Sequence, residues 1–353
     1  MNPLKVLVVD DSFTMRLLIS DILNSDPHIR VIDAVRSGEE AIQKIPLLNP
    51  DCITLDLVMP GMDGLSTLKN IMKKFPTPTI ILSAHSKRDA DITFRCLAHG
   101  AVSFVPKPSG EFSYNIESIR SRIIEEVKII GQIQNYSKKC KMPYTAIQET
   151  LGYFNQQSQK MIVIGASTGG PQSLEALLTQ LPANFAASIL VAQHMPSGIF
   201  LESFVERLNR KTWMSVKIAN HEEKIQPSTI YCLPSGCKVI IKTDHENVLF
   251  EIERESLGDI AKNTPSIDDA MSQIAKIYGS NSVGVVLSGM GQDGLLGMQS
   301  IKRHGGTTFV QDEDALLFGM PKAVIEQGLA DKVLPIHSIA NQIQGLLVND
   351  KGL

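Results

Sequence analysis

Hydrophobic and polar positions follow two alternating patterns through the first third of the chain. Runs that are apolar throughout predict short strands at Lys5–Val9, Val31–Val35, Ile53–Leu55, Thr79–Leu82 and Ala101–Val105. Apolar residues at helical spacing predict helices between them, at Thr14–Asn24, Glu39–Leu47, Gly64–Lys74 and Asp89–Ala98. Strands without polar alternation are buried on both faces, as in a parallel sheet covered by helices. The pattern therefore predicts a doubly wound α/β domain with a (βα)5 order.

The same alternation returns from Met161 onward. Apolar runs predict strands at Met161–Ile164, Ser188–Ala192, Thr229–Leu233, Val283–Leu287, Thr307–Val310 and Lys332–Leu334, and helical spacing recurs at 172–181, 199–210, 267–278, 293–303, 320–327 and 338–347. Val239–Lys242 and Val248–Glu253 flank a short polar turn and predict a β-hairpin attached to this sheet. We expect a second, larger and mostly parallel doubly wound domain.

A polar stretch separates the two patterns. Residues 112–133 have helical spacing, whereas 132–160 are polar and weakly periodic, with a basic cluster at Lys138, Lys139 and Lys141. This composition is typical of a linker. We therefore predict one domain over residues 1–128, a linker over 129–158 and a second domain over 159–353.

Composition and charge narrow the classes of function. The chain has 353 residues, of which 43% are hydrophobic and 20% charged, as expected for two globular domains. A net charge of −3 without a strongly basic segment does not suggest a nucleic-acid partner. No apolar run reaches the roughly 18–20 residues of a transmembrane helix, and the N-terminal residues match a strand rather than a signal peptide. The five cysteines lack CxxC spacing. We expect a cytoplasmic protein with reduced thiols that is not embedded in a membrane.

Acidic residues follow two of the predicted strands in the first domain. Asp10 and Asp11 end the first strand, Asp56 ends the third, Ser83 ends the fourth and Lys107 follows the fifth. In a parallel sheet these positions meet at one edge, where clustered carboxylates repel one another unless a cation such as Mg²⁺ binds them. A metal ion, an ammonium group and a hydroxyl aimed at one carboxylate suit transfer of a phosphoryl group to it. The alternative is that these acids are unrelated turn or cap residues.

Three segments of this domain resemble a response-regulator receiver domain of flavodoxin-like fold. They are Val8–Ser12, Leu55–Gly64 and Phe104–Pro108, and the resemblance covers about residues 3–125. It implies that Asp56 is the phosphoacceptor and that Mg²⁺ is bound by Asp10, Asp11, Asp56 and the carbonyl group of Val58. It also implies that Ser83 and Lys107 contact the phosphoryl group and that Phe104 is the aromatic switch residue.

A serine lies in a glycine-rich turn at the start of the second domain. Ser167 follows the strand Met161–Ile164, His194 follows the next strand and Asp293 follows a third. Carboxyl ends of parallel strands can converge, so these residues could form a Ser-His-Asp triad for acyl transfer, with the backbone N–H groups of Thr168 or Met290 as oxyanion donors. Each has a plainer alternative: the turn could cradle a phosphate, His194 could be a hydrogen-bonded loop residue, and Asp293 could cap a helix.

Motifs around these residues resemble the catalytic domain of the CheB family of chemotaxis methylesterases. They are Gly165–Gly170, Gln193–Pro196, Pro265–Asp268, Gly289–Gly294 and Phe318–Pro321, within a resemblance that covers residues 160–348. It implies a phosphorylation-activated protein-glutamate methylesterase and protein-glutamine glutaminase with Ser167, His194 and Asp293 as its triad and no cofactor for the ester reaction. The implied partners are methyl-accepting chemoreceptors as substrate and a CheA-type sensor histidine kinase as phosphodonor. Lys238 and Asn263–Thr264 depart from the family pattern.

Other functions remain open at this point. The chain could act mainly as a glutamine deamidase, or it could be a phosphorylation-dependent binding module whose triad is vestigial. A transcription-factor output is disfavoured, because no helix-turn-helix pattern with a basic recognition helix follows Met161.

Overall fold

The computed structural model describes residues 2–107, 116–131, 133, 136, 160–196, 198–245, 247–254 and 265–348. The chain divides into two compact units, Met1–Pro143 and Tyr144–Leu353. The predicted linker at 129–158 lies mostly outside the described residues, so the predicted domain limits stay a prediction. Among the helices that the structure describes, none has the length and apolar character needed to span a bilayer.

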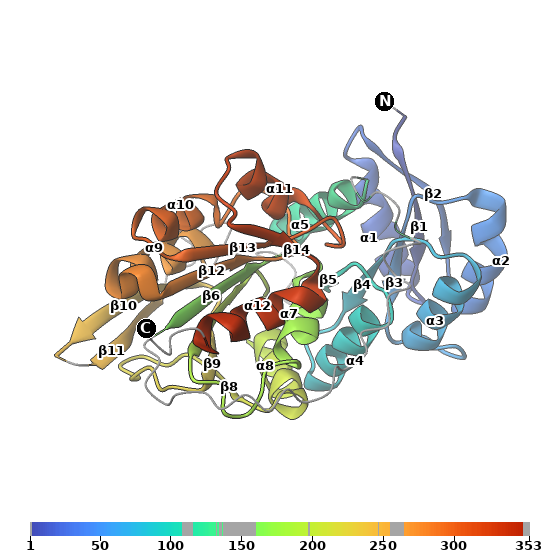
Figure 1. Cartoon of the computed structure of the whole chain (residues 1–353). Helices are drawn as coiled ribbons and strands as arrows, with labels where there is room; N and C mark the ends of the chain where they lie inside the picture. The colour runs from blue at the N-terminus through green and yellow to red at the C-terminus, as the bar shows by residue number, and fades with distance from the viewer. Residues whose placement is uncertain are drawn as a thin grey trace. The chain divides into compact units, whose positions relative to one another are not determined.

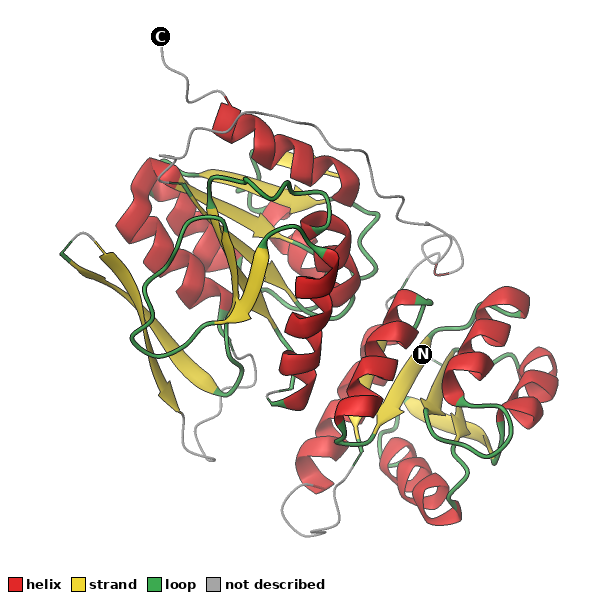
Figure 2. Cartoon of the chain, turned by 90° about the horizontal axis from the view of Figure 1, so that it is seen from below, coloured by secondary structure: helices red, strands yellow, loops and turns green. Residues whose placement is uncertain are grey.

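The first unit is a parallel five-stranded sheet with helices on both faces (Figure 2). Its elements are β1 (Leu4–Val9), α1 (Phe13–Asn24), β2 (Ile29–Val35), α2 (Gly38–Leu48), β3 (Cys52–Asp56), α3 (Gly64–Lys74), β4 (Thr79–Ser83), α4 (Lys87–Ala98), β5 (Ser103–Pro106) and α5 (Ile116–Ile130). The strand order β2-β1-β3-β4-β5 confirms the predicted doubly wound fold. The chain reverses direction across the sheet at β1 and β3, where a parallel sheet opens its crevice.

Four helices of this unit begin at a side-chain cap a few residues after a strand or turn. Ser12, Ser37, Asp63 and Ser86 accept a hydrogen bond from the backbone N–H three residues later, at the start of α1, α2, α3 and α4 respectively. Such caps satisfy amide groups that the first turn of a helix leaves unpaired. They also fix the residue at which each helix begins after its strand, and therefore the positions of the polar residues at the sheet edge.

The second unit is a parallel seven-stranded sheet between helices (Figure 1). Its elements are β6 (Met161–Ala166), α7 (Gly170–Leu178), β7 (Ser188–Gln193), α8 (Ile199–Lys211), β8 (Ser215–Ile218), β9 (Thr229–Cys232), β10 (Cys237–Asp244), β11 (Asn247–Arg254), α9 (Ile267–Tyr278), a 3-10 turn (Gly279–Asn281), β12 (Ser282–Val286), α10 (Leu295–Arg303), β13 (Thr307–Gln311), α11 (Gly319–Glu326), β14 (Lys332–Leu334) and α12 (Ile336–Val348). The order is β14-β13-β12-β6-β7-β9-β8. Its central strands are fully buried, which explains their unbroken apolar sequences.

Two details of this unit differ from the sequence analysis. The edge strand β8 was not predicted, because Ser215–Ile218 is short, partly polar and only partly buried. The predicted hairpin forms a two-stranded antiparallel sheet of its own, β10-β11, which projects from its unit in Figure 1. Backbone hydrogen bonds join it to the segment before β9, between Glu222 and Phe250 and between Ile225 and Val248.

Candidate functional site

The acidic residues of the first unit meet at the carboxyl ends of β1 and β3. One carboxylate oxygen from each of Asp10, Asp11 and Asp56 lies within 4.8 Å of the others. Lys107 Nζ lies 2.8 Å from Asp10 Oδ2 and 2.8 Å from Asp56 Oδ2. The structure therefore brings together four side chains that the sequence separates by almost 100 positions.

Burial shifts the pKa values of the charged groups in this acidic cluster. Asp10 is fully buried and Asp56 is 4% exposed. Burial raises the pKa of Asp56, against the attraction of Lys107, which lowers it. Burial alone would lower the pKa of Lys107, but Asp56 and Asp10 outweigh it and the pKa is raised. One ammonium group thus pairs with two carboxylates and a third, from Asp11, lies close to these two, so the excess negative charge suits a hard divalent cation with oxygen ligands.

Backbone groups orient the two buried carboxylates. Ser12 N donates to Asp10 Oδ1 at 2.9 Å, and Val58 N donates to Asp56 Oδ1 at 3.3 Å. Gly64 allows α3 to begin against this edge, because a Cβ there would lie 2.3 Å from the carbonyl oxygen of Asp56. The carbonyl group of Val58 as a metal ligand stays a prediction.

Ser83 and Phe104 occupy the neighbouring strands. Ser83 is buried at the end of β4, where its hydroxyl accepts a hydrogen bond from Thr93 Oγ1 at 2.9 Å and its carbonyl accepts one from Lys107 N at 2.7 Å. Phe104 is 5% exposed on β5, with its ring edge-on to Phe94 at 5.9 Å between centroids. Ser83 ends β4 and Phe104 lies in β5, as the sequence predicted. Their roles toward a phosphoryl group stay a prediction.

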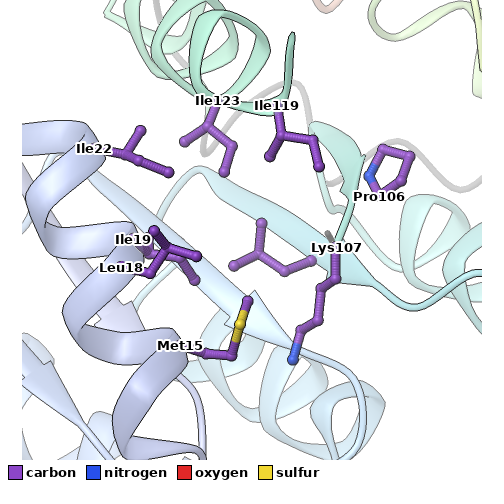
Figure 3. Close-up of a pocket in the computed structure, with 9 residues that line it drawn as sticks. Met15, Leu18, Ile19, Ile22, Pro106, Lys107, Ile119 and Ile123 are labelled. Atoms are coloured by element: carbon purple, nitrogen blue, oxygen red, sulfur yellow. The ribbon is translucent and has the colours of Figure 1, made fainter. Parts of the chain in front are cut away.

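The stem of Lys107 also borders an apolar pocket between α1 and α5. Its lining consists of Met15, Leu18, Ile19, Ile22, Leu82, Pro106, Lys107, Ile119 and Ile123. In Figure 3 the nitrogen of Lys107 points away from Ile119 and Ile123. Hydrophobic packing around the aliphatic stem thus supports a lysine whose charged end faces the carboxylates.

The serine of the second unit directly follows β6. At this strand the order in which the chain adds strands to the larger sheet reverses. Ser167 N donates to Ser288 O at 3.0 Å, and Ser167 O accepts from Gly170 N at 2.7 Å. Gly169 has φ of 79°, which glycine adopts without strain, and a Cβ there would lie 2.5 Å from Ser288 Oγ. The glycines of this turn are therefore required by its backbone conformation and close packing.

His194 and Asp293 pair at the same edge of the sheet. His194 follows β7, and its Nε2 lies 2.8 Å from Asp293 Oδ2, with both side chains about nine-tenths buried. Burial would raise the pKa of Asp293, but hydrogen bonds from His194 and from the backbone of Ile267 and Asp268 hold it below its usual value. Asp293 is consequently an ionised acceptor that orients the imidazole ring.

Two helices anchor Asp293. Its carboxylate accepts hydrogen bonds from the first two N–H groups of α9, Ile267 N at 3.0 Å and Asp268 N at 2.9 Å. The side chain of Asp268 in turn accepts from Gly294 N at 2.9 Å and Gly297 N at 2.7 Å at the start of α10. Asp293 therefore satisfies the amino end of α9, which carries Asp268, and Asp268 satisfies the amino end of α10, which follows Asp293.

The candidate oxyanion donors lie beside the serine. Thr168 is the next residue, and its carbonyl accepts a hydrogen bond from Ser288 Oγ at 2.9 Å. Met290 follows Gly289, where a Cβ would lie 2.9 Å from Ser167 Cβ. Their use as donors stays a prediction.

Sequence reasoning assigned no role to Gln193, Asp268 or Ser288, although each contacts the site. Gln193 and Asp268 occur inside the motifs quoted for the resemblance, which was the available signal. Of the two departures from the family pattern, Lys238 is 61% exposed on the hairpin, 3.9 Å from Glu253, and Asn263–Thr264 lie outside the described residues.

Comparison with known proteins identifies the family of each unit. A family model described as CheB methylesterase matches residues 162–343, and one described as response regulator receiver domain matches residues 6–114. Fold and sites together define a class of protein in which a response-regulator receiver is joined to an α/β unit with a serine site. Within that class, the chain belongs to the CheB methylesterase family.

Individual relatives match almost end to end. A Thermotoga maritima protein named protein-glutamate methylesterase/protein-glutamine glutaminase is 37% identical over 341 residues, covering 96% of this chain and 97% of the relative. A Pyrococcus horikoshii protein of the same name is 36% identical over 343 residues, covering 96% and 92%. The crystal structure of the Thermotoga maritima CheB methylesterase catalytic domain superimposes with a TM-score of 0.51 at 39% identity, covering 53% of this chain and 98% of that one.

Proposed function

We propose that the chain is a phosphorylation-activated protein-glutamate methylesterase that also deamidates protein glutamines. Its substrates are glutamate γ-methyl esters of chemoreceptors, and Ser167, His194 and Asp293 are its catalytic triad. The observation that carries this proposal is the 2.8 Å contact between His194 Nε2 and Asp293 Oδ2 beside the Ser167 turn. Membership of the family and the names of the full-length relatives support the substrate class.

The ring of His194 has a defined orientation in this mechanism. Because ionised Asp293 accepts a hydrogen bond from Nε2, the neutral ring carries its proton there and leaves Nδ1 as the base. The two ring nitrogens therefore have the reverse of their roles in chymotrypsin, where Nε2 faces the serine. Asp293 stabilises the imidazolium that forms when Nδ1 takes a proton.

The reaction passes through an acyl-enzyme. Ser167 Oγ attacks the ester carbonyl carbon while its proton passes to His194 Nδ1, and backbone N–H groups at Thr168 and Met290 stabilise the oxyanion. Collapse of this intermediate breaks the bond to the methoxy group, which leaves as methanol with the proton from His194. Water then hydrolyses the acyl-enzyme to glutamate. With a glutamine side chain the leaving group is ammonia, which is the basis of the glutaminase activity.

The receiver unit supplies the control. Asp56 is the phosphoacceptor, and a histidine kinase of the CheA type is the phosphodonor. Asp10, Asp11 and Asp56, with the carbonyl group of Val58, would hold Mg²⁺, which neutralises charge during phosphoryl transfer. Lys107 and Ser83 would bind the phosphoryl oxygens, and Phe104 would respond to their new position.

Methanol release from methylated receptor tests the esterase proposal. Ser167→Ala in the full chain should lower kcat by on the order of 10⁵-fold, since it removes the nucleophile. Ammonia release from receptor glutamines should fall in parallel if one triad serves both reactions. A Ser167→Ala protein that keeps wild-type turnover would contradict the role of Ser167 as nucleophile, and a wild type without turnover would contradict the esterase proposal and favour a binding module.

A further inference from the structure

One side chain hydrogen-bonds to the backbone of both Ser167 and His194. Gln193, the last residue of β7, is 3% exposed. Its Nε2 donates to Ser167 O at 2.9 Å and to His194 O at 2.8 Å. The N–H groups of the same two residues are held by other strand ends, Ser167 N by Ser288 O and His194 N by Ala166 O, each at 3.0 Å. Gln193 therefore adds a side-chain link between the serine turn and the histidine to the backbone hydrogen bond from His194 N to Ala166 O.

We propose that Gln193 is a positioning residue that sets the separation of Ser167 and His194, an inference that rests on the proposed esterase function. Its amide group is a single planar donor with two N–H bonds, and each one ends on a different catalytic residue. A shift of either carbonyl lengthens one hydrogen bond at once. The serine hydroxyl and the imidazole are thereby kept in register for proton transfer, a step that is sensitive to small displacements.

The side-chain oxygen of Gln193, Oε1, indicates that this residue does more than fill space. Within the described part of the chain, its Oε1 is buried without a hydrogen-bond partner. It packs against the first turn of α7, where a Cβ on Gly170 would lie 2.0 Å from it. An apolar side chain of the same shape would fill the space without burying an unpaired acceptor. A glutamine is needed here only if its two donors matter.

The matched variants are Gln193→Met and Gln273→Met. Gln273, on α9, also bridges two backbone groups of another element, Ile241 N at 2.6 Å and Val239 O at 3.1 Å, but lies away from the triad. Both substitutions keep side-chain length and remove partly buried hydrogen bonds in the same unit. A third variant, Gln193→Glu, keeps the shape but turns a carboxyl group, which can donate at most one hydrogen bond, toward two carbonyl oxygens.

The measurement is kcat and KM for methanol release, with kcat expressed per serine that a fluorophosphonate probe titrates, so that unfolded molecules do not count. Gln193→Met should lose about 10- to 100-fold in kcat with KM changed less than about threefold, and Gln193→Glu should lose more. Gln273→Met should keep wild-type kcat even if its melting temperature falls.

The possible results separate the inference from the function beneath it. Wild-type kcat per titrated site in Gln193→Met, or a loss in Gln273→Met as large as in Gln193→Met, would overturn the positioning role while leaving the esterase proposal intact. A wild-type protein without methanol release would overturn both.

Discussion

At the scale of single residues, two neighbouring, partly buried carboxyl groups of the second unit have pKa values shifted in opposite directions. Asp293 has its pKa lowered by donors that outweigh its burial, and Asp268 lies next to it in the opposite condition. Burial raises the pKa of Asp268, hydrogen bonds from Gly297 and Gly294 oppose this, and repulsion by Asp293 adds to it. The ionised form of Asp293 is stabilised by its hydrogen bond with His194. The ionised form of Asp268, which bonds to the start of α10, carries a free-energy cost because it is partly buried beside Asp293.

The pH dependence of stability should reveal this cost. The pKa of Asp268 is higher in the folded chain than its ordinary value of 3.8, so the folded state binds an extra proton at pH values between these two pKa values. Protonated Asp268 therefore stabilises the folded state at a pH below the pKa that the group has in the unfolded chain. This stabilisation is lost as the pH rises through the pKa that it has in the folded chain. Asp268→Asn keeps an acceptor for Gly294 and Gly297 without the charge. Its free energy of unfolding relative to wild type should therefore increase from pH 4 to pH 7 in urea titrations.

Asp268→Ala is the control for the hydrogen bonds themselves. It leaves the amino end of α10 without an acceptor and should cost about 1 kcal/mol, as loss of a helix cap does. A difference between Asp268→Asn and wild type that stays constant with pH would show that the charge of Asp268 has no influence on folding.

At the scale of elements, close packing of α9 against α10 positions Asp293, the aspartate of the proposed triad. Gly297 on α10 faces Met271 on α9, and a Cβ at Gly297 would lie 2.6 Å from Met271 Cβ. Only a residue without a side chain allows this approach. Because α9 donates to Asp293, any separation of the two helices moves the carboxylate that holds His194.

Gly297→Ala and Gly345→Ala should thus have opposite effects on stability. In Gly297→Ala the helices must move apart, at a cost of about 1–3 kcal/mol and with lower kcat for methanol release. In Gly345→Ala, on α12, no atom of the described residues outside the neighbouring backbone of that helix lies within 4 Å of the new Cβ, and helix propensity should stabilise the unit by up to about 1 kcal/mol. Thermal unfolding of both variants measures the contrast. Equal effects at the two positions would rule out a tight α9–α10 contact.

Elements buried on both faces could be predicted from sequence, whereas edges and long-range contacts could not. Strands such as Val283–Leu287 are apolar without interruption because helices cover them, and their ends carry Asp56, Ser167 and His194. The edge strand β8 lacks that signal. Gln193 and Asp268 act through partners that only the tertiary structure brings near, so no spacing rule could assign them.

At the scale of the whole molecule, one chain carries two sites at equivalent places in two sheets. Asp56 lies at the carboxyl end of β3, beside the point where the strand order of the five-stranded sheet reverses. Ser167 lies at the carboxyl end of β6, at the corresponding point of the seven-stranded sheet. A parallel sheet leaves its functional groups at such a crevice. We expect phosphorylation at the first site to control turnover at the second.

Methanol release by the full-length chain, measured with and without a small phosphodonor in the presence of Mg²⁺, tests this claim most directly. The wild type should accelerate between about 5- and 150-fold, the usual range for coupling between two sites. Asp56→Asn should stay at the basal rate, and omission of Mg²⁺ should remove the response of the wild type. Equal acceleration of Asp56→Asn, or an unchanged rate in wild-type protein whose phosphorylation is verified by intact mass, would contradict the account.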